Sequence, residues 1–163
     1  MFDKVGGIPA HPLLVHAAVV LIPLLIIGAI LHAVWPRMRG RLGWLVALLA
    51  VAAPLAAFVA KLSGQELRDD LIAKGYSPEI LAMVDEHYGY GDLTLWYTLA
   101  LGAVTLVHLY LAGQFAPALR APETLPAAVR WVLVAAIVVL GVIASYYVFK
   151  TGDTGAKAVW TGV

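Results

Sequence analysis

Four long apolar stretches dominate the chain and predict four membrane-spanning helices. The stretches cover residues 13–35, 42–62, 93–113 and 129–148. Each is close to the ~20 residues that an α-helix needs to cross the ~30 Å hydrocarbon core of a bilayer. A span in lipid must satisfy its own backbone hydrogen bonds, and the stretches lack the alternating pattern of a barrel, so they predict helices.

The polar connection between the second and third stretches has a helical pattern of its own. Residues 65–74 place their leucines and isoleucine on one face, and a glycine follows. Residues 77–79 read Ser-Pro-Glu, a typical helix start with a capping serine and a proline at the first position. Residues 80–88 again have apolar positions on one face, which includes His87. We therefore expect a cap of two short amphipathic helices, at about residues 65–89, on the membrane surface.

Proline, glycine and polar residues predict where the helices begin and end. Pro12 suits the first position of the first span, because its missing N–H needs no partner there, and this leaves His11 as the N-cap. Asp92 is a suitable N-cap for the third span. Gly152 and Gly155 are expected to break the fourth helix, so that the residues after them form a short interfacial turn.

The composition supports an integral membrane protein. Of the 163 residues, 62% are hydrophobic and 13% are charged, against roughly 45–50% and 25% in soluble domains. A soluble domain of this size could not bury so much apolar surface. The prediction is an all-α protein with a single domain, residues 1–163, in which the four spans form an up-down-up-down four-helix bundle in the lipid bilayer.

Charge and cysteine content exclude several functions. The net charge of +1 provides no overall field for binding nucleic acid. The absence of cysteine excludes disulfides, thiolate metal sites and cysteine nucleophiles. The chain has no GxSxG elbow, no P-loop and no GxGxxG fingerprint, and so we assign no catalytic residue.

The distribution of arginine predicts the orientation in the membrane. Arg37, Arg39 and Arg41 lie in the tight turn between the first two spans. Arg120 and Arg130 lie in or beside the connection between the last two. Short positively charged loops stay in the cytoplasm, so we expect both termini outside, in the inner (cytoplasmic) membrane of a bacterium. Small residues along the spans would allow close helix contacts within one chain or in a homo-oligomer.

Five histidines are the main candidates for chemistry, because ionisable residues in membrane spans are costly and often functional. His32 and His108 lie at similar depths near the inner ends of the first and third spans, which are diagonal partners in such a bundle. We expect them to approach each other and to serve as the two axial ligands of a b-type haem. His16 lies ~160° around the first helix from His32, and so these two do not serve one site.

A second group of histidines lies near the outer ends of the helices. His11, His16 and His87 could hold a divalent metal ion, because nearby acidic residues would attract a cation. Alternatively, His16 and His87 could be the axial ligands of an outer haem. An alternative role for His11 is to orient a ligand histidine through a hydrogen bond. These positions also have a purely structural interpretation, since histidine at a membrane surface can simply extend its polar end to the headgroups.

Four segments of the chain carry a further signal. They are residues 7–16, which contain an HPxxVH motif, residues 63–65, residues 85–92, and residues 155–160. Together these segments, which span essentially the whole chain, resemble the bacterial membrane family catalogued as domain of unknown function 2231 (DUF2231). Some relatives are joined to Rieske-type iron–sulfur domains, so the resemblance implies a respiratory or other redox setting with such a partner.

Two functional hypotheses from different classes follow. The first is a small membrane redox protein, an electron carrier rather than an enzyme, that binds a b-type haem or a metal ion through histidine ligands. The alternative is a cofactor-free structural or accessory subunit of a larger complex. Transport is less favoured, because no broken pair of helices and no buried acidic residue marks a substrate site.

Overall fold

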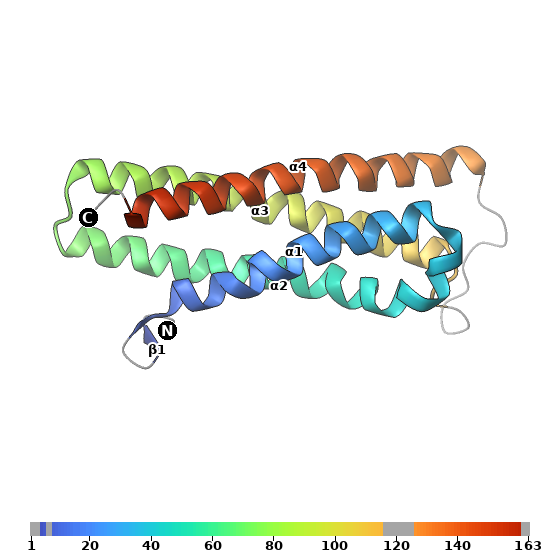
Figure 1. The fold of residues 1–163 in the computed structure, drawn as a ribbon, viewed down its shortest axis with the longest axis horizontal. Coiled ribbons are helices and arrows are strands. Elements are labelled where there is room, and N and C mark those ends of the chain that lie inside the picture. The colour runs from blue at the N-terminus through green and yellow to red at the C-terminus, as the bar shows by residue number, and fades with distance from the viewer. Residues whose placement is uncertain (1–3, 6–7, 116–125, 161–163) are drawn as a thin grey trace.

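The fold is a bundle of four long α-helices (Figure 1). The computed structural model describes residues 4–5, 8–115 and 126–160. The helices are α1 (Ala10–Val34), α2 (Arg39–Ala73), α3 (Pro78–Leu111) and α4 (Ala127–Trp160). The shorter elements are a 3-10 turn, η1 (Pro36–Met38), and two antiparallel strands, β1 (Lys4–Val5) and β2 (Ile8–Pro9). This architecture confirms the predicted all-α fold.

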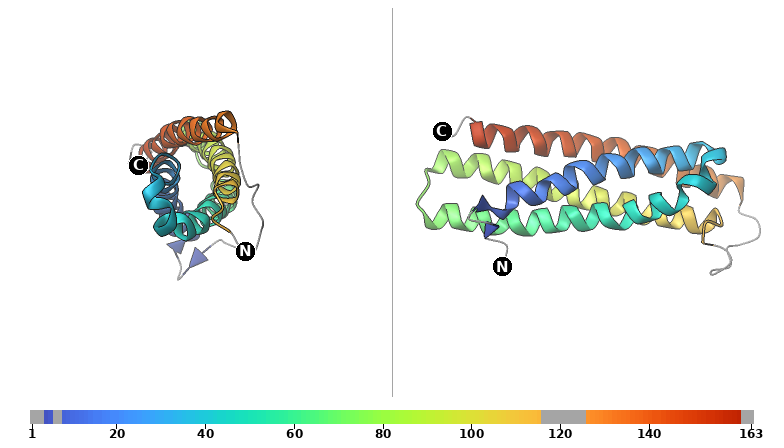
Figure 2. Two further views of the ribbon diagram at one scale, coloured as in Figure 1. Left: turned by 90° about the vertical axis from the view of Figure 1, so that its right-hand side faces the viewer. Right: turned by 60° about the horizontal axis from the view of Figure 1, so that its bottom comes forward.

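The four helices are arranged around a common axis (Figure 2). Each helix packs against the next one in the chain, and α4 closes the bundle against α1. The diagonal partners α1 and α3 therefore run in the same direction. α1 begins and α4 ends toward the same end of the bundle (Figure 1). All four helices are long and apolar enough to cross a membrane, which confirms the predicted up-down-up-down membrane bundle.

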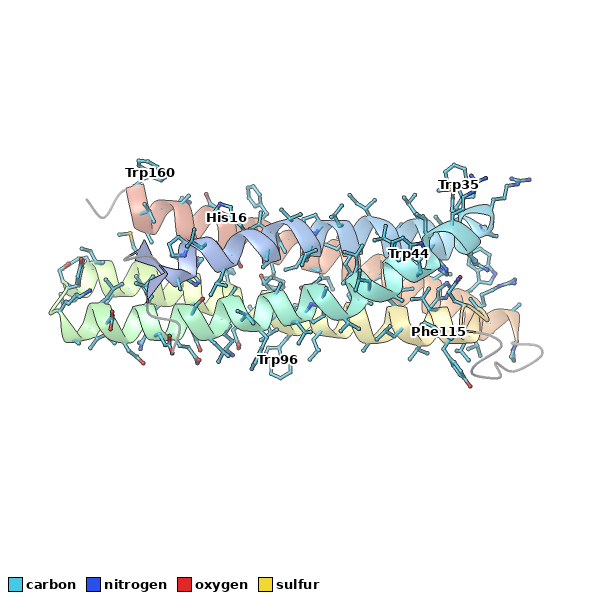
Figure 3. All side chains as sticks on the ribbon, turned by 90° about the horizontal axis from the view of Figure 1, so that it is seen from below. His16, Trp35, Trp44, Trp96, Phe115 and Trp160 are labelled. Atoms are coloured by element: carbon cyan, nitrogen blue, oxygen red, sulfur yellow. The ribbon has the colours of Figure 1, made fainter. Side chains whose placement is uncertain are left out.

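Small residues fill much of the bundle interior, and large apolar residues cover its outer surface. Ala53 and Ala144 are fully buried, whereas Phe149 is 71% exposed. An apolar outer surface faces lipid in a membrane bundle, in which helices pack closely through small residues. Trp35 and Trp160 lie at opposite ends of the bundle (Figure 3), as tryptophans do at the two membrane–water interfaces.

The predicted cap of two separate helices at residues 65–89 is not present. These residues instead extend α2 and α3, which are 35 and 34 residues long, or ~50 Å each at 1.5 Å per residue. The amphipathic pattern is compatible with both arrangements, because a helix that leaves the membrane keeps the same period. A 2.7 Å hydrogen bond from Gln65 to Tyr88 and a 2.5 Å ion pair between Arg68 and Asp85 join the two extensions.

Three predicted helix ends also differ from the structure, and one is confirmed. α1 begins at Ala10, so His11 lies in its first turn rather than at the N-cap. α3 runs through Asp92, whose carboxylate pairs with Lys61 of α2 instead of capping a helix. α4 continues through both of its C-terminal glycines. The predicted start of α3, with Ser77 as N-cap, is confirmed.

Candidate functional site

The five histidines form two pairs and leave one histidine apart. His11 and His87, the first histidine pair, have ring centroids 6.1 Å apart, and His32 and His108, the second histidine pair, have theirs 5.5 Å apart. Each pair joins α1 to α3 across the bundle. His16 is exposed, and its Nδ1 lies 2.6 Å from a carbonyl oxygen of its own helix (Figure 3). The expected approach of His32 and His108 is confirmed. The alternative pairing of His16 with His87 is not found, because the ring beside His87 is that of His11.

His11 is held by the backbone and a side chain of α2. Its Nδ1 lies 3.0 Å from the carbonyl oxygen of Ala60 and 3.0 Å from Oγ of Ser63. A carbonyl oxygen can only accept a hydrogen bond, so Nδ1 carries the proton, and Nε2 is the unprotonated nitrogen of the neutral ring. The buried Ser63 donates its hydroxyl to the same carbonyl at 2.9 Å, which fixes this group of atoms.

His87 is held in the same way by α4. Its Nδ1 donates to the carbonyl oxygen of Thr151 at 2.9 Å, and Oγ1 of the buried Thr154 lies 3.4 Å from the same nitrogen. All four helices therefore contribute to this site. α1 and α3 supply the imidazoles, and α2 and α4 supply the carbonyl groups that orient them. This arrangement is typical of histidines that bind a metal through Nε2.

Two glycines make room for the first histidine pair. A Cβ atom at Gly64 of α2 would lie 3.1 Å from Cε1 of His11, and a Cβ atom at Gly155 of α4 would lie 2.8 Å from Cε1 of His87. A side chain at Gly155 would therefore displace the His87 ring, and one at Gly64 would press on His11. The sequence interpretation assigned Gly155 to a helix break, but its role is to admit an imidazole.

The first histidine pair lies outside the uncharged spans and is neutral at pH 7. Burial lowers the pKa of His87 below its usual value near 6.5, and the hydrogen bond to Thr151 partly opposes this effect. Burial also lowers the pKa of His11, as does the neighbouring His87, while the hydrogen bond to Ala60 opposes both. A neutral imidazole with an unprotonated Nε2 is the form that binds a metal centre.

The second histidine pair lies deeper in the bundle. His32 and His108 are 1% and 3% exposed. Nε2 of His32 lies 3.4 Å from Oε1 of Gln114, which follows α3. Arg39, at the start of α2, donates to the carbonyl oxygens of His32 at 3.1 Å and of Ala33 at 3.0 Å, and so satisfies the end of α1. Sequence reasoning missed Gln114, although a polar residue directly after an apolar span was an available signal.

The number of ligands limits what each pair can bind. Among the described residues, no three His, Asp or Glu side chains lie close enough to hold a metal ion. The predicted divalent metal site formed jointly by His11, His16 and His87 is therefore not assembled. A bare zinc ion takes at least three protein ligands. A haem iron takes only its axial ligands from the protein, because the porphyrin supplies the other four.

The spacing of the first histidine pair fits two axial ligands of one iron. A metal–imidazole bond is about 2.0–2.1 Å long, so ring centroids on opposite sides of one metal lie roughly 6–6.5 Å apart. The observed 6.1 Å falls in this range. Two rings in direct edge-to-face contact have a similar spacing. The anchored Nδ1 atoms of His11 and His87, rather than the distance alone, therefore distinguish a ligand pair from simple packing.

Comparison with known proteins gives no match: no family model, no curated protein and no solved structure is similar to this chain. The resemblance to DUF2231 therefore stays a prediction. The functional argument rests on the geometry of the two histidine pairs.

Proposed function

We propose that this protein is a small membrane redox protein that holds a b-type haem between His11 and His87. One observation carries the proposal: each Nδ1 is hydrogen-bonded to a backbone carbonyl of a flanking helix, Ala60 in α2 and Thr151 in α4. This anchoring selects, in both rings at once, the tautomer that can bind iron through Nε2. Two axial ligands are also the number that a haem requires from the protein.

Each part of the site has a role in this proposal. A bound haem would supply one-electron chemistry. His11 and His87 would be its axial ligands, and the carbonyl groups of Ala60 and Thr151 would keep both rings oriented and raise their basicity. The apolar helices around the site would limit the access of water, and this shell is one of the factors that set a redox potential.

We also propose that this site faces the outside of a bacterial inner membrane. Arg37 lies in η1, and Arg39 and Arg41 lie in the first turn of α2. These segments are at the opposite end of the bundle from the start of α1 (Figure 1). A short arginine-rich turn favours the cytoplasmic side. A redox partner, such as a Rieske-type iron–sulfur domain, would then meet the first histidine pair from the outer side.

Haem content tests the proposal. The full-length protein is produced in cells supplied with the haem precursor aminolaevulinate, purified in detergent, and assayed for haem per chain. His11→Ala and His87→Ala are each expected to remove one haem equivalent per chain, because either change leaves the iron with one axial ligand. His16→Ala is the matched control, since His16 lies on the exposed face of α1, and it is expected to keep the wild-type haem content.

Three other outcomes would overturn the proposal. Equal haem content in all variants would exclude this site. A colourless protein that contains zinc, copper or iron by elemental analysis would replace the haem with a bare metal ion. A colourless protein without metal would favour the alternative function, a cofactor-free accessory subunit of a larger complex.

A further inference from the structure

The two histidine pairs are related by a regular spacing in the sequence. His11 and His32 are 21 residues apart on α1, and His87 and His108 are 21 residues apart on α3. In a four-helix bundle with coiled-coil packing, positions separated by whole heptads lie on the same face, and 21 residues are three heptads. Therefore α1 and α3 each carry two histidines, at two levels along the bundle, on the face that points toward the other helix.

The flanking helix α2 repeats with the same period. Gly64 lies against His11, and Gly43, 21 residues earlier, lies at the level of the second histidine pair. A Cβ atom at Gly43 would overlap the side-chain amide of Gln114, so the missing side chain admits this amide into the bundle. Oε1 of Gln114 accepts from Nε2 of His32 at 3.4 Å, which makes Nδ1 the unprotonated nitrogen of His32.

The second histidine pair contains two nitrogen atoms that lack partners. Within the described part of the chain, no group forms a hydrogen bond with Nδ1 of His32 or with Nε2 of His108, and both atoms are buried. Buried polar groups are costly when they are not bonded, and in a membrane bundle little water reaches them. The ring centroids are 5.5 Å apart. This spacing is shorter than the roughly 6–6.5 Å across one metal, so the two rings would move apart by about 0.5–1 Å to take a metal centre between them, which would satisfy both nitrogens.

The charge beside the second histidine pair favours haem over a bare ion. The guanidinium of Arg39 donates to the carbonyl oxygens of His32 and Ala33, so a fixed positive charge lies next to the pair. This charge would repel a bare divalent cation, which would also have only two imidazole ligands. A haem brings four ring nitrogens for its iron and two carboxylates of its own, and arginine pairs well with carboxylates.

We propose that His32 and His108 are the axial ligands of a second haem, toward the opposite end of the bundle from the first. This inference deepens the proposed function and rests on it for the class of cofactor. Three heptads correspond to roughly 30 Å along a helix, which is about the thickness of the hydrocarbon core. The chain then has one haem site near each face of the membrane, with Gln114 as a positioning residue for His32.

The ratio of haem to protein tests this inference separately from the first site. The purified full-length protein, loaded with haemin, is expected to bind two haems per chain in a pyridine haemochrome assay. His32→Ala and His108→Ala are each expected to lower the ratio to one, and adding His87→Ala is expected to remove the remaining haem. His16→Ala is expected to keep both.

Conservative variants distinguish the loss of a haem ligand from a loss of folding. His108→Met keeps an axial ligand, so it is expected to retain two haems per chain and to raise the midpoint potential of one of them. Gln114→Leu removes the acceptor for Nε2 of His32, which makes that ring a weaker ligand and is expected to raise the same potential. A purely structural role of these residues would leave both potentials unchanged.

The remaining outcomes separate the two proposals. One haem per chain that is unaffected by His32→Ala and His108→Ala would overturn this inference and leave the first site intact. Two haems that survive His32→Ala would place the second haem elsewhere and would also overturn it. A wild-type protein without haem would overturn both proposals.

Discussion

The first histidine pair depends on two positions that have no side chain. Gly155→Ala would place a methyl group 2.8 Å from the His87 ring, and such overpacking is expected to cost about 1–3 kcal/mol of folding free energy. Gly152→Ala is the control, because no described atom lies within 4 Å of its Cβ position, and it is expected to stabilise the helix by up to about 1 kcal/mol. Unfolding in mixed detergent measures both, and equal effects would contradict this account.

The lowered pKa values of His11 and His87 predict how stability depends on pH. In the unfolded chain each histidine titrates near 6.5, and in the folded protein each binds its proton less tightly. The unfolded state therefore takes up more protons as the pH falls below about 6.5, and stability decreases.

The haem-free protein is accordingly expected to unfold at a lower temperature at about pH 5.5 than at about pH 7.5. The double variant His11→Ala/His87→Ala lacks both groups, so its melting temperature is expected to change less over the same range. Melting curves at the two pH values make the comparison. The same decrease in both proteins would show that other groups control the pH dependence.

The two histidines of the HPxxVH motif differ because of their positions around the helix. His11 and His16 are about 140° apart on an α-helix, so only one of them can face the bundle. His11 does so and is bound by Ala60 and Ser63 of α2. The sequence could identify both as candidates, but it could not select one, because apolar residues surround α1 on every side and leave no polar face to orient it.

Two of the ion pairs among the described residues join α2 to α3, and their surroundings predict different energies. The side chains of Arg68 and Asp85 are 35% and 51% exposed, so solvent screens their interaction and Asp85→Ala is expected to cost little stability. Lys61 lies near the end of an apolar stretch, and Asp92→Ala would leave its ammonium group without its carboxylate partner, at a cost of about 1–3 kcal/mol. Chemical unfolding of both variants tests the order, and a smaller cost for Asp92→Ala would contradict it.

The helices themselves could be predicted well in their apolar parts and poorly beyond them. Long uncharged runs require a span, and the Ser-Pro-Glu start of α3 has a local signature, so these features were correctly predicted. The continuation of α2 and α3 past the membrane has no such signature. Gly64 and Gly155 could not be interpreted because a helix break and a close contact have the same sequence signal, and only the imidazole on a neighbouring helix distinguishes them.

The proposed orientation of the whole molecule rests on its charge distribution, and labelling can test it. Gly40, at the start of α2, and Ser77, in the connection between α2 and α3, are both exposed. These two segments lie at opposite ends of the bundle (Figure 1). A cysteine introduced at Gly40 is expected to react with a membrane-impermeant maleimide only after the cells are opened, and one at Ser77 is expected to react in intact cells. Labelling of both from the same side would contradict the four-span arrangement, and the reverse pattern would invert the orientation.

The pairing of histidines is a property of the whole bundle rather than of any one segment. The equal spacing of 21 residues on α1 and α3 was present in the sequence. This spacing indicates two histidine pairs only when α1 and α3 are known to be parallel diagonal partners, with the histidines of each pair at the same depth. The sequence placed His32 and His108 at a shared depth by counting residues from the span ends, whereas the extension of α3 beyond the membrane obscured the same match for His11 and His87.

The absorption spectrum of the purified protein tests the central claim most directly. Wild-type protein from cells supplied with a haem precursor is expected to show a Soret band that shifts on reduction with dithionite, as haem iron with two imidazole ligands does. His87→Ala is expected to weaken this band, and His16→Ala is expected to leave it unchanged. A wild-type spectrum without a Soret band, or a band that is the same in all three proteins, would contradict a haem held by His11 and His87.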